Sequence, residues 1–228
     1  FYIKSYTTGM KFLLTSAGIT NDHLAQVLSE MLGKPLAEAS LLFVPTAANT
    51  EGGDKRWLIG NLKDLEKYDF QSIDILDVAA VARDIWEKRF AENDVICVGG
   101  GNEKYLAEVF DAIGMRQMLL TLPDDKVYVG ISAGSMVTGN FMPEELYPSI
   151  FPEEDFGETK IQPMQIHDFC FIPHLNSDFF THIHKEHLEK VKGKFSCNVY
   201  ATDDETALRD EDGRVSLVGI GESWEFEV

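Results

Sequence analysis

The chain has 228 residues, of which 38 are acidic and 20 basic, so its formal net charge at neutral pH is −18. A surface of that sign disfavours nucleic acids and anionic membranes, which bind basic patches. No apolar run has the length that spans a bilayer or forms a signal-peptide core. The three cysteines are far apart and odd in number, which is typical of reduced thiols. We therefore expect a cytoplasmic protein without nucleic-acid or membrane partners.

Short apolar runs alternate with segments of helical periodicity through the first 131 residues. The runs predict strands at residues 11–16, 41–45, 72–78, 94–98 and 127–131, and the intervening segments predict helices at 22–32, 54–68, 81–92 and 103–113. Repeated strand–helix units of this length predict an α/β fold of three layers, in which a mostly parallel sheet carries helices on both faces.

The pattern changes after residue 132. Residues 141–165 are rich in Pro and Glu, which predicts a long surface loop. Further strands are predicted at 169–172, 198–201, 207–209 and 215–218, with a polar helix at 178–192. No repeat or linker interrupts the chain, so we expect residues 10–228 to form a single domain. Residues 1–9 are interpreted as a tag remnant or an irregular arm.

The sharpest motif is Gly130-Ile131-Ser132-Ala133-Gly134, which follows a predicted strand and precedes a helical segment. A G-x-S-x-G sequence forms a tight strand-to-helix turn that projects the serine hydroxyl from the end of the strand. The backbone N–H of Ala133 and the N-terminus of the following helix would favour a developing oxyanion. Ser132 is therefore the candidate nucleophile, although a chance match to so short a motif is the alternative.

A second motif, Gly99-Gly100-Gly101-Asn102, follows the preceding strand. Glycines allow the backbone to approach a substrate closely, and the carboxyl ends of parallel strands share one edge of the sheet. Gly100 or Gly101 could supply a second oxyanion donor there, with Gly101 and Asn102 near the substrate. A dinucleotide-binding loop is less well supported because Lys104 replaces the third glycine of that pattern. A plain loop that requires positive φ is a further alternative.

A serine nucleophile needs a base within hydrogen-bonding reach. Of the six histidines, His174 directly follows a predicted strand and could lie at the same sheet edge as Ser132. His182, His184 and His187 suggest a metal site, but only the last two share a helical face and no further ligands complete a set. We expect neither a metal nor a cofactor, and His184 could still face the substrate.

A third group should orient the base, and carboxylates at the start of a late strand are candidates. Glu205 occupies such a position, and Asp204 is its close rival. The residues alone do not decide between them.

Gly-Gly-Gly-Asn after one strand, Gly-x-Ser-Ala-Gly after the next and Pro-His after a third resemble the peptidase E and cyanophycinase family of serine peptidases. The resemblance implies a fold related to class I glutamine amidotransferases. It matches Ser132 with the nucleophile, His174 with the histidine and Glu205 with the late glutamate of the triad. Gly100 and Ala133 match the oxyanion hole. An acid between serine and histidine is the other possibility for the triad, and Glu144 and Glu145 lie in that stretch.

One departure concerns specificity. Aspartyl dipeptidases of this family carry an arginine on the helix after the histidine, whereas the predicted helix 178–192 has none. His184 is its nearest match by register, with Lys185 beside it, and neither offers the planar fork that binds a carboxylate. The sequence predicts a serine peptidase that acts on small peptides, dipeptidase-like, with aspartyl peptides among the candidates. The alternatives are an α/β-hydrolase esterase and a non-catalytic binding domain. The oligomeric state, monomer or homodimer, stays open.

Overall fold

The computed structural model describes residues 9–152, 154, 157 and 159–228. Except for Gly9, the predicted arm at residues 1–9 lies outside the described residues. No helix within the described ranges is both long and apolar enough to cross a membrane.

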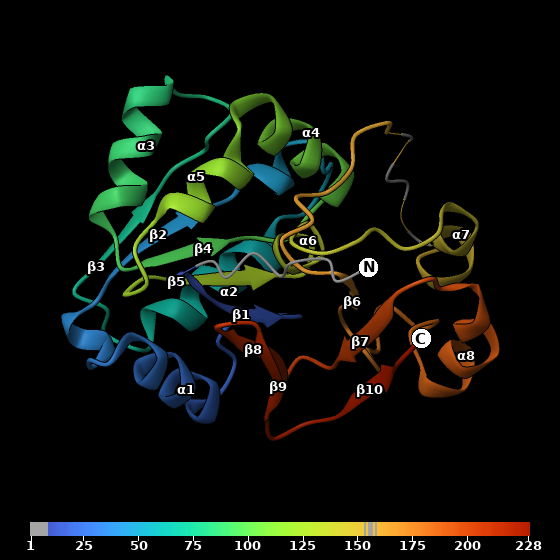
Figure 1. The fold of residues 1–228 in the computed structure, drawn as a ribbon. Helices are drawn as coiled ribbons and strands as arrows, with labels where there is room; N and C mark the ends of the chain where they lie inside the picture. Colours follow the sequence, from blue (N-terminus) through green and yellow to red (C-terminus); the bar gives the residue numbers. More distant parts are fainter. Residues whose placement is uncertain (1–8, 153, 155–156, 158) are drawn as a thin grey trace.

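A seven-stranded sheet forms the centre of the molecule, in the order β3-β2-β4-β5-β1-β8-β9 (Figure 1). Its strands are β1 (Lys11–Thr15), β2 (Ser40–Val44), β3 (Ser72–Ile75), β4 (Val95–Val98), β5 (Val127–Ile131), β8 (Thr206–Glu211) and β9 (Arg214–Gly219). The first five strands in that order are parallel, whereas β8 and β9 form an antiparallel hairpin that pairs with β1. β5 therefore lies in the middle of the sheet, and it ends directly before Ser132, as the predicted strand-to-helix turn requires.

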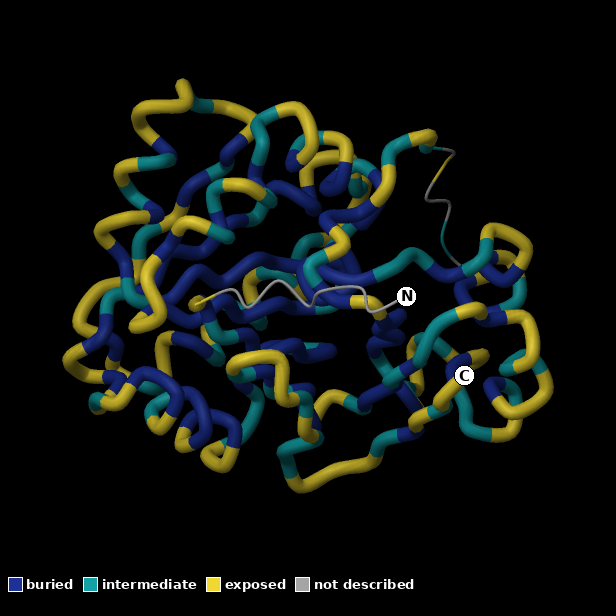
Figure 2. The backbone as a smooth tube through the Cα atoms, viewed as in Figure 1, coloured by how far each residue is buried: buried dark blue, intermediate teal, exposed yellow. Residues whose placement is uncertain are grey.

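The sheet is covered on both faces, as alternate residues of one strand show. Phe12 and Leu14 of β1 belong to one apolar cluster, and Leu13 belongs to the other. Residues of α1 (Asp22–Leu32) and α2 (Arg56–Glu66) join the second cluster, and residues of α3 (Arg83–Glu92), α4 (Glu103–Ile113) and α5 (Met115–Thr121) join the first. The central strands are accordingly buried between two helical layers (Figure 2), whereas the edge strands β3 and β9 are more exposed. The predicted three-layer α/β fold is confirmed.

A second, smaller sheet lies beside the hairpin strands (Figure 1). Its order is β10-β7-β6, formed by β6 (Phe169–Ile172), β7 (Asn198–Thr202) and β10 (Ser223–Phe226). β6 and β7 are parallel, and β10 is antiparallel to β7. β7 ends a few residues before β8, so this sheet and the main sheet are joined where residues 203–205 turn.

Several predicted bounds differ from the structure. The helix predicted at 178–192 contains only α8 (Lys185–Val191), because Ser177 Oγ accepts the N–H groups of Phe179 and Phe180 and His184 is extended. The loop predicted at 141–165 contains η3 (Glu144–Leu146) and α7 (Tyr147–Ile150), whose apolar side chains are buried. The remaining short elements are α6 (Ala133–Met136), η1 (Leu36–Glu38), η2 (Thr46–Asn49) and η4 (Lys192–Lys194).

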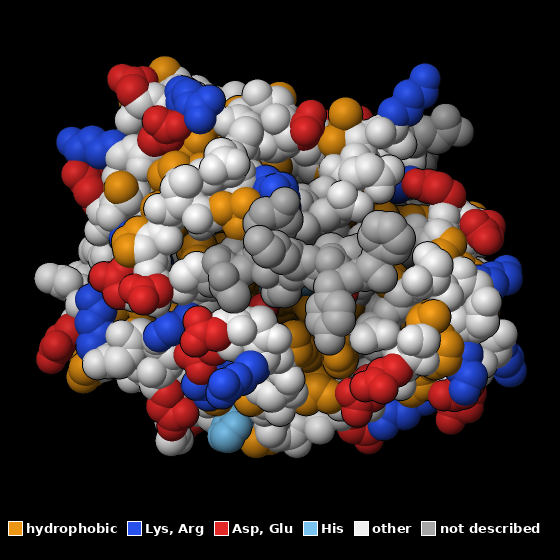
Figure 3. Space-filling view, in the orientation of Figure 1, with side chains coloured by type: hydrophobic (Ala, Val, Ile, Leu, Met, Phe, Trp, Pro, Cys, Tyr) orange, Lys and Arg blue, Asp and Glu red, His pale blue; other side chains and the backbone are white. Residues whose placement is uncertain are grey.

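On the face seen in Figure 3, acidic side chains are interspersed with Lys and Arg rather than gathered in one area. The net charge of −18 is therefore not the property of one patch on that face.

Candidate active site

Ser132 occupies a strained turn between β5 and α6. Its backbone has φ 49° and ψ −110°, a conformation that residues other than glycine rarely adopt. Strain of this kind costs about 1–3 kcal/mol and persists only where the surroundings hold it. A Cβ on Gly130 would lie 2.6 Å from Ser135 Oγ, and one on Gly134 would lie 2.1 Å from the Val98 carbonyl oxygen. The two glycines of the motif are therefore required by contact, and Ser132 lies in a tight strand-to-helix turn of the predicted kind.

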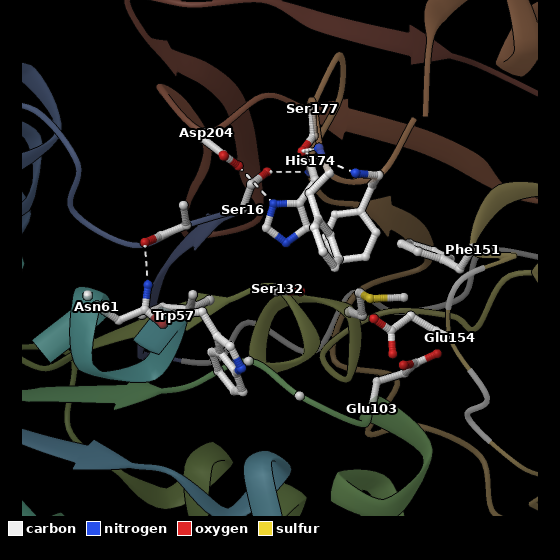
Figure 4. A pocket seen from close by; sticks show the side chains of 18 of the residues that line it. Ser16, Trp57, Asn61, Glu103, Ser132, Phe151, Glu154, His174, Ser177 and Asp204 are labelled. Carbon is white, nitrogen blue, oxygen red and sulfur yellow. Dashed lines mark hydrogen bonds and ion pairs between the residues drawn. The ribbon is translucent and has the colours of Figure 1, made fainter. Parts of the chain in front are cut away.

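Ser132 opens into a cavity of about 450 Å³ at the carboxyl ends of the parallel strands, here called the Ser132 cleft. In Figure 4, Ser16, His174 and Asp204 lie together on one side of the cleft, and Ser132 lies on the other. The lining comprises Ser16, Ala17, Glu51, Trp57, Gly60, Asn61, Asp64, Gly100, Gly101, Glu103, Ile131, Ser132, Met136, Phe151, Glu154, His174, Ser177, Phe179, Phe180 and Asp204.

His174 is held in place from three sides. Its ring Nδ1 lies 2.8 Å from Asp204 Oδ1, and the ring stacks on Phe180 with centroids 4.7 Å apart. Its backbone N–H donates to Ser16 Oγ at 3.0 Å, which supports a residue whose φ is 64°. With Nδ1 donating to the carboxylate, Nε2 carries the free lone pair and faces the cleft on the side of Ser132 (Figure 4).

The carboxylate that contacts His174 belongs to Asp204, not to the expected Glu205. Glu205 is exposed, its N–H donates to Asp203 Oδ1 at 3.0 Å, and its carbonyl accepts from Asn21 Nδ2 at 3.2 Å. Neighbouring residues in the turn before β8 point in different directions, so a shift of one position changes which side chain reaches the imidazole. Glu144 is also elsewhere, because its carboxylate binds Lys104 Nζ at 2.7 Å.

The two predicted oxyanion donors lie next to the serine. A Cβ added to Gly100 would be 3.3 Å from Ser132 Cβ, so a side chain at this position would crowd Ser132. Ala133 is the first residue of α6 and is fully buried. Within the part of the chain that the structure describes, neither N–H donates to a protein acceptor. Both groups are thus available to a substrate oxygen.

Three residues were expected to bind substrate, and the structure separates them. Gly101 lines the cleft with φ 130°, and a Cβ there would lie 2.3 Å from the Ala47 carbonyl oxygen. Asn102 instead caps α4, because its side chain accepts the Tyr105 N–H at 2.9 Å, and it is absent from the cleft lining. His184 also lies outside the lining, with Nδ1 3.2 Å from Asn176 Oδ1.

Metal ligands do not gather around these histidines. The rings of His182 and His187 are 6.4 Å apart, and no set of three His, Cys, Asp or Glu side chains in the described ranges is arranged to hold a metal ion.

Sequence reasoning missed two contributors to the site. Ser16 follows β1 without a recognisable motif, and only the fold brings it to His174. Glu103 comes directly after the motif Gly99-Gly100-Gly101-Asn102, and this position could have suggested that it lies at the same cleft. The cleft is lined by five carboxylates, from Glu51, Asp64, Glu103, Glu154 and Asp204, and by no Lys or Arg among the described residues.

The model of peptidase family S51 matches residues 12–218 of this chain. An uncharacterized peptidase of Listeria innocua is 26% identical over 176 residues, which cover 76% of this chain and 82% of that protein. An uncharacterized peptidase of Listeria monocytogenes is 25% identical over 158 residues, 68% of this chain and 75% of that protein.

Solved structures share the fold. The "Putative Peptidase E Protein" of Listeria monocytogenes EGD-e superposes with a TM-score of 0.73 at 21% identity, over 93% of this chain and 99% of that one. A peptidase from an acI-B1 actinobacterium gives a TM-score of 0.64 at 19% identity, over 99% and 100% of the two chains. Because the family model spans nearly the whole described fold, the chain belongs to peptidase family S51, the peptidase E family, and is a serine-type peptidase.

Proposed function

We propose that this peptidase hydrolyses small peptides through an acyl-enzyme on Ser132, with His174 as the base and Asp204 as the group that orients it. The observation that carries the proposal is the 2.8 Å contact between His174 Nδ1 and Asp204 Oδ1 in the cleft that Ser132 lines. His174 Nε2 takes the proton of the Ser132 hydroxyl as its oxygen attacks the peptide carbonyl. The resulting imidazolium then protonates the leaving amine.

The tetrahedral intermediate needs donors for its oxyanion, and the N–H groups of Gly100 and Ala133 are proposed for this role. Gly100 lines the same cleft as Ser132, and Ala133 directly follows Ser132 and is buried. One donor of this kind contributes about 3–4 kcal/mol to the transition state. Water, activated by His174, then attacks the ester and releases the acid product.

The substrate is proposed to be a short peptide, consistent with dipeptidase-like activity. A cavity of about 450 Å³ lies toward the small end of the range for small-molecule sites. Phe151, Phe179 and Phe180 provide apolar contact near the imidazole. Aspartyl peptides are the poorer candidates because the lining carries carboxylates and His184 lies outside it.

An esterase of α/β-hydrolase type is not favoured by the order of the residues. In that fold the acid precedes the histidine along the chain, whereas Asp204 follows His174. We propose the cytoplasm as the compartment, since Cys97, Cys170 and Cys197 are unpaired thiols.

The direct test replaces Ser132 with Ala and measures turnover on a dipeptide and tripeptide panel, scored by the amino acids released. We expect the variant to retain the circular dichroism spectrum of the wild type and to lose at least about 10³-fold in kcat/KM. An active-site fluorophosphonate probe should label the wild type at Ser132. Full turnover by the variant would refute the assignment, and wild-type protein that neither turns over peptides nor labels would favour a binding domain.

A further inference from the structure

Glu103 is a buried acid that the proposed chemistry does not use. It is the first residue of α4, directly after Gly101 and Asn102, and none of its surface is exposed to solvent although it lines the Ser132 cleft. Neither carboxylate oxygen accepts a hydrogen bond of normal geometry. Burial raises the pKa of Glu103 to about 7, and the nearby Tyr147 hydroxyl and the charge of Lys104 offset only part of that rise.

The adjacent cation is engaged elsewhere. Lys104 Nζ donates to Glu144 Oε2 at 2.7 Å and to the Gly157 carbonyl at 2.8 Å, and it lies over the Tyr147 ring. No Lys or Arg among the described residues lines the cleft. The charge of an ionised Glu103 is therefore not balanced by an ion pair within the described protein.

A second carboxylate faces the first. Figure 4 shows Glu154, from the segment after α7, directed toward Glu103 at the end of the cleft away from Asp204. Two carboxylates that face one another repel when both are ionised, and the burial of Glu103 increases the cost of charging it. A positive group placed between them would reduce both the repulsion and the cost of holding a charge in a buried site.

We propose that Glu103 and Glu154 form a subsite that binds a cationic nitrogen of the peptide substrate. The inference rests on the proposed hydrolysis and adds a specificity to it. Glu103 lies three residues from Gly100 and lines the same cleft as Ser132, so the cation would be bound in the cleft that holds the attacked carbonyl. An α-ammonium group and a lysine side chain offer the same chemistry, and the experiment separates them.

A purely structural role makes a different prediction. An acid in the first turn of a helix interacts favourably with the helix dipole, and this alone could retain Glu103 at the start of α4. Its loss would then alter stability without altering the choice between charged and neutral substrates.

The test compares Glu103→Gln with the wild type on two matched pairs of peptides drawn from the best substrate of the panel. One pair has a free or an acetylated N-terminus, and the other has lysine or norleucine at the same position. At pH 8, where Glu103 is ionised, we expect the wild type to prefer one charged member. Glu103→Gln should raise KM for that member about 10- to 100-fold and leave its neutral partner within about twofold. The pair that responds identifies the cation.

Two further variants serve as comparison and control. Glu154→Gln should also raise KM for the same charged peptide. Glu145→Gln, at an exposed position outside the cleft, should change KM for neither the charged nor the neutral peptide.

Equal losses for charged and neutral peptides, or no change for any of them, would overturn the subsite. Binding of the same peptides to Ser132→Ala and to Ser132→Ala/Glu103→Gln, measured by calorimetry, separates this proposal from the catalytic one. If Ser132→Ala/Glu103→Gln binds the charged peptide more weakly than Ser132→Ala does, the subsite is supported even if the wild type hydrolyses no peptide. Hydrolysis with no selectivity change would leave the peptidase assignment intact and refute the subsite.

Discussion

Asp204 Oδ1 lies 2.8 Å from His174 Nδ1, across a turn that joins the small sheet to the main one. Asp204 follows the end of β7 and His174 follows the end of β6, and these two strands are parallel neighbours. The acid and the imidazole therefore emerge from the same edge of one sheet and meet beside Ser132, which emerges from the other sheet (Figure 4).

Replacing Asp204 with Asn should lower kcat/KM by about 10²- to 10⁴-fold, because an amide at this position no longer favours the tautomer with a free Nε2. The matched control is Glu205→Gln, one residue along the same turn, which should retain activity within about twofold because its side chain does not touch the imidazole. Steady-state kinetics on the best panel substrate decides between them. The reverse result, with Glu205→Gln inactive, would return the orienting role to Glu205.

Replacing Ser16 with Ala should lower kcat/KM by about tenfold with a smaller change in KM. Ser16 Oγ accepts from the His174 N–H and donates to the Thr202 carbonyl at 2.7 Å, so its loss removes the acceptor of the His174 N–H at a cost of about 1–3 kcal/mol. Ser29→Ala is the control, since its hydroxyl donates to the Lys34 carbonyl at the end of α1. If both variants lose stability but Ser16→Ala keeps full activity, Ser16 does not position His174.

Gly134→Ala should prevent folding or lower the free energy of unfolding by several kcal/mol. Its Cβ would meet the Val98 carbonyl oxygen at 2.1 Å, and the rigid strand β4 cannot move away. Gly60→Ala within α2 is the control, because an added Cβ meets nothing within 4 Å and alanine favours a helix by about 1 kcal/mol. Urea denaturation of the two variants tests this contrast, and a stable Gly134→Ala protein would contradict the proposed packing of the turn at Ser132.

The stability of the protein should depend on pH through Glu103. Burial raises the pKa of its carboxyl from 4.5 to about 7, so the folded chain retains this proton over a range in which the unfolded chain has released it. The stabilising contribution is fully present below about pH 4.5 and is lost as the pH rises to 7, amounting to about 3 kcal/mol at most.

Glu103→Gln removes this titration. The unfolding free energy of the variant minus that of the wild type should be larger at pH 8 than at pH 5. For exposed Glu145→Gln, this difference should be the same at both pH values. Urea denaturation at the two pH values measures the difference. A gain that is the same at both pH values would mean that Glu103 titrates normally in the folded protein.

The sequence predicted those parts of the site that local patterns encode. Gly130 and Gly134 mark the turn at Ser132 because it leaves no room for a Cβ, and the apolar runs around them define the strands. The choice between Asp204 and Glu205 depends on how one turn directs successive side chains, and no pattern records that. Ser16 reaches His174 from 158 positions away, a proximity that only the completed fold creates.

The expected substrate contacts at Asn102 and His184 did not appear at the cleft, for a related reason. Asparagine is a favourable residue just before a helix begins, because its side chain can cap the helix. In this chain the Asn102 side chain caps α4, although the motif alone suggested that it contacts the substrate. His184 was placed by helical register, but the segment before α8 is irregular, so that register does not apply.

The division of the machinery between two sheets has a consequence for biosynthesis. Ser132 and its neighbouring N–H donors lie in the first two thirds of the chain, whereas the imidazole and its carboxylate partner come from strands completed near the C-terminus. Under the proposed mechanism, a nascent polypeptide that has already formed the turn at Ser132 still lacks the base that would activate the serine. Hydrolytic competence would then be acquired only when the last strands dock.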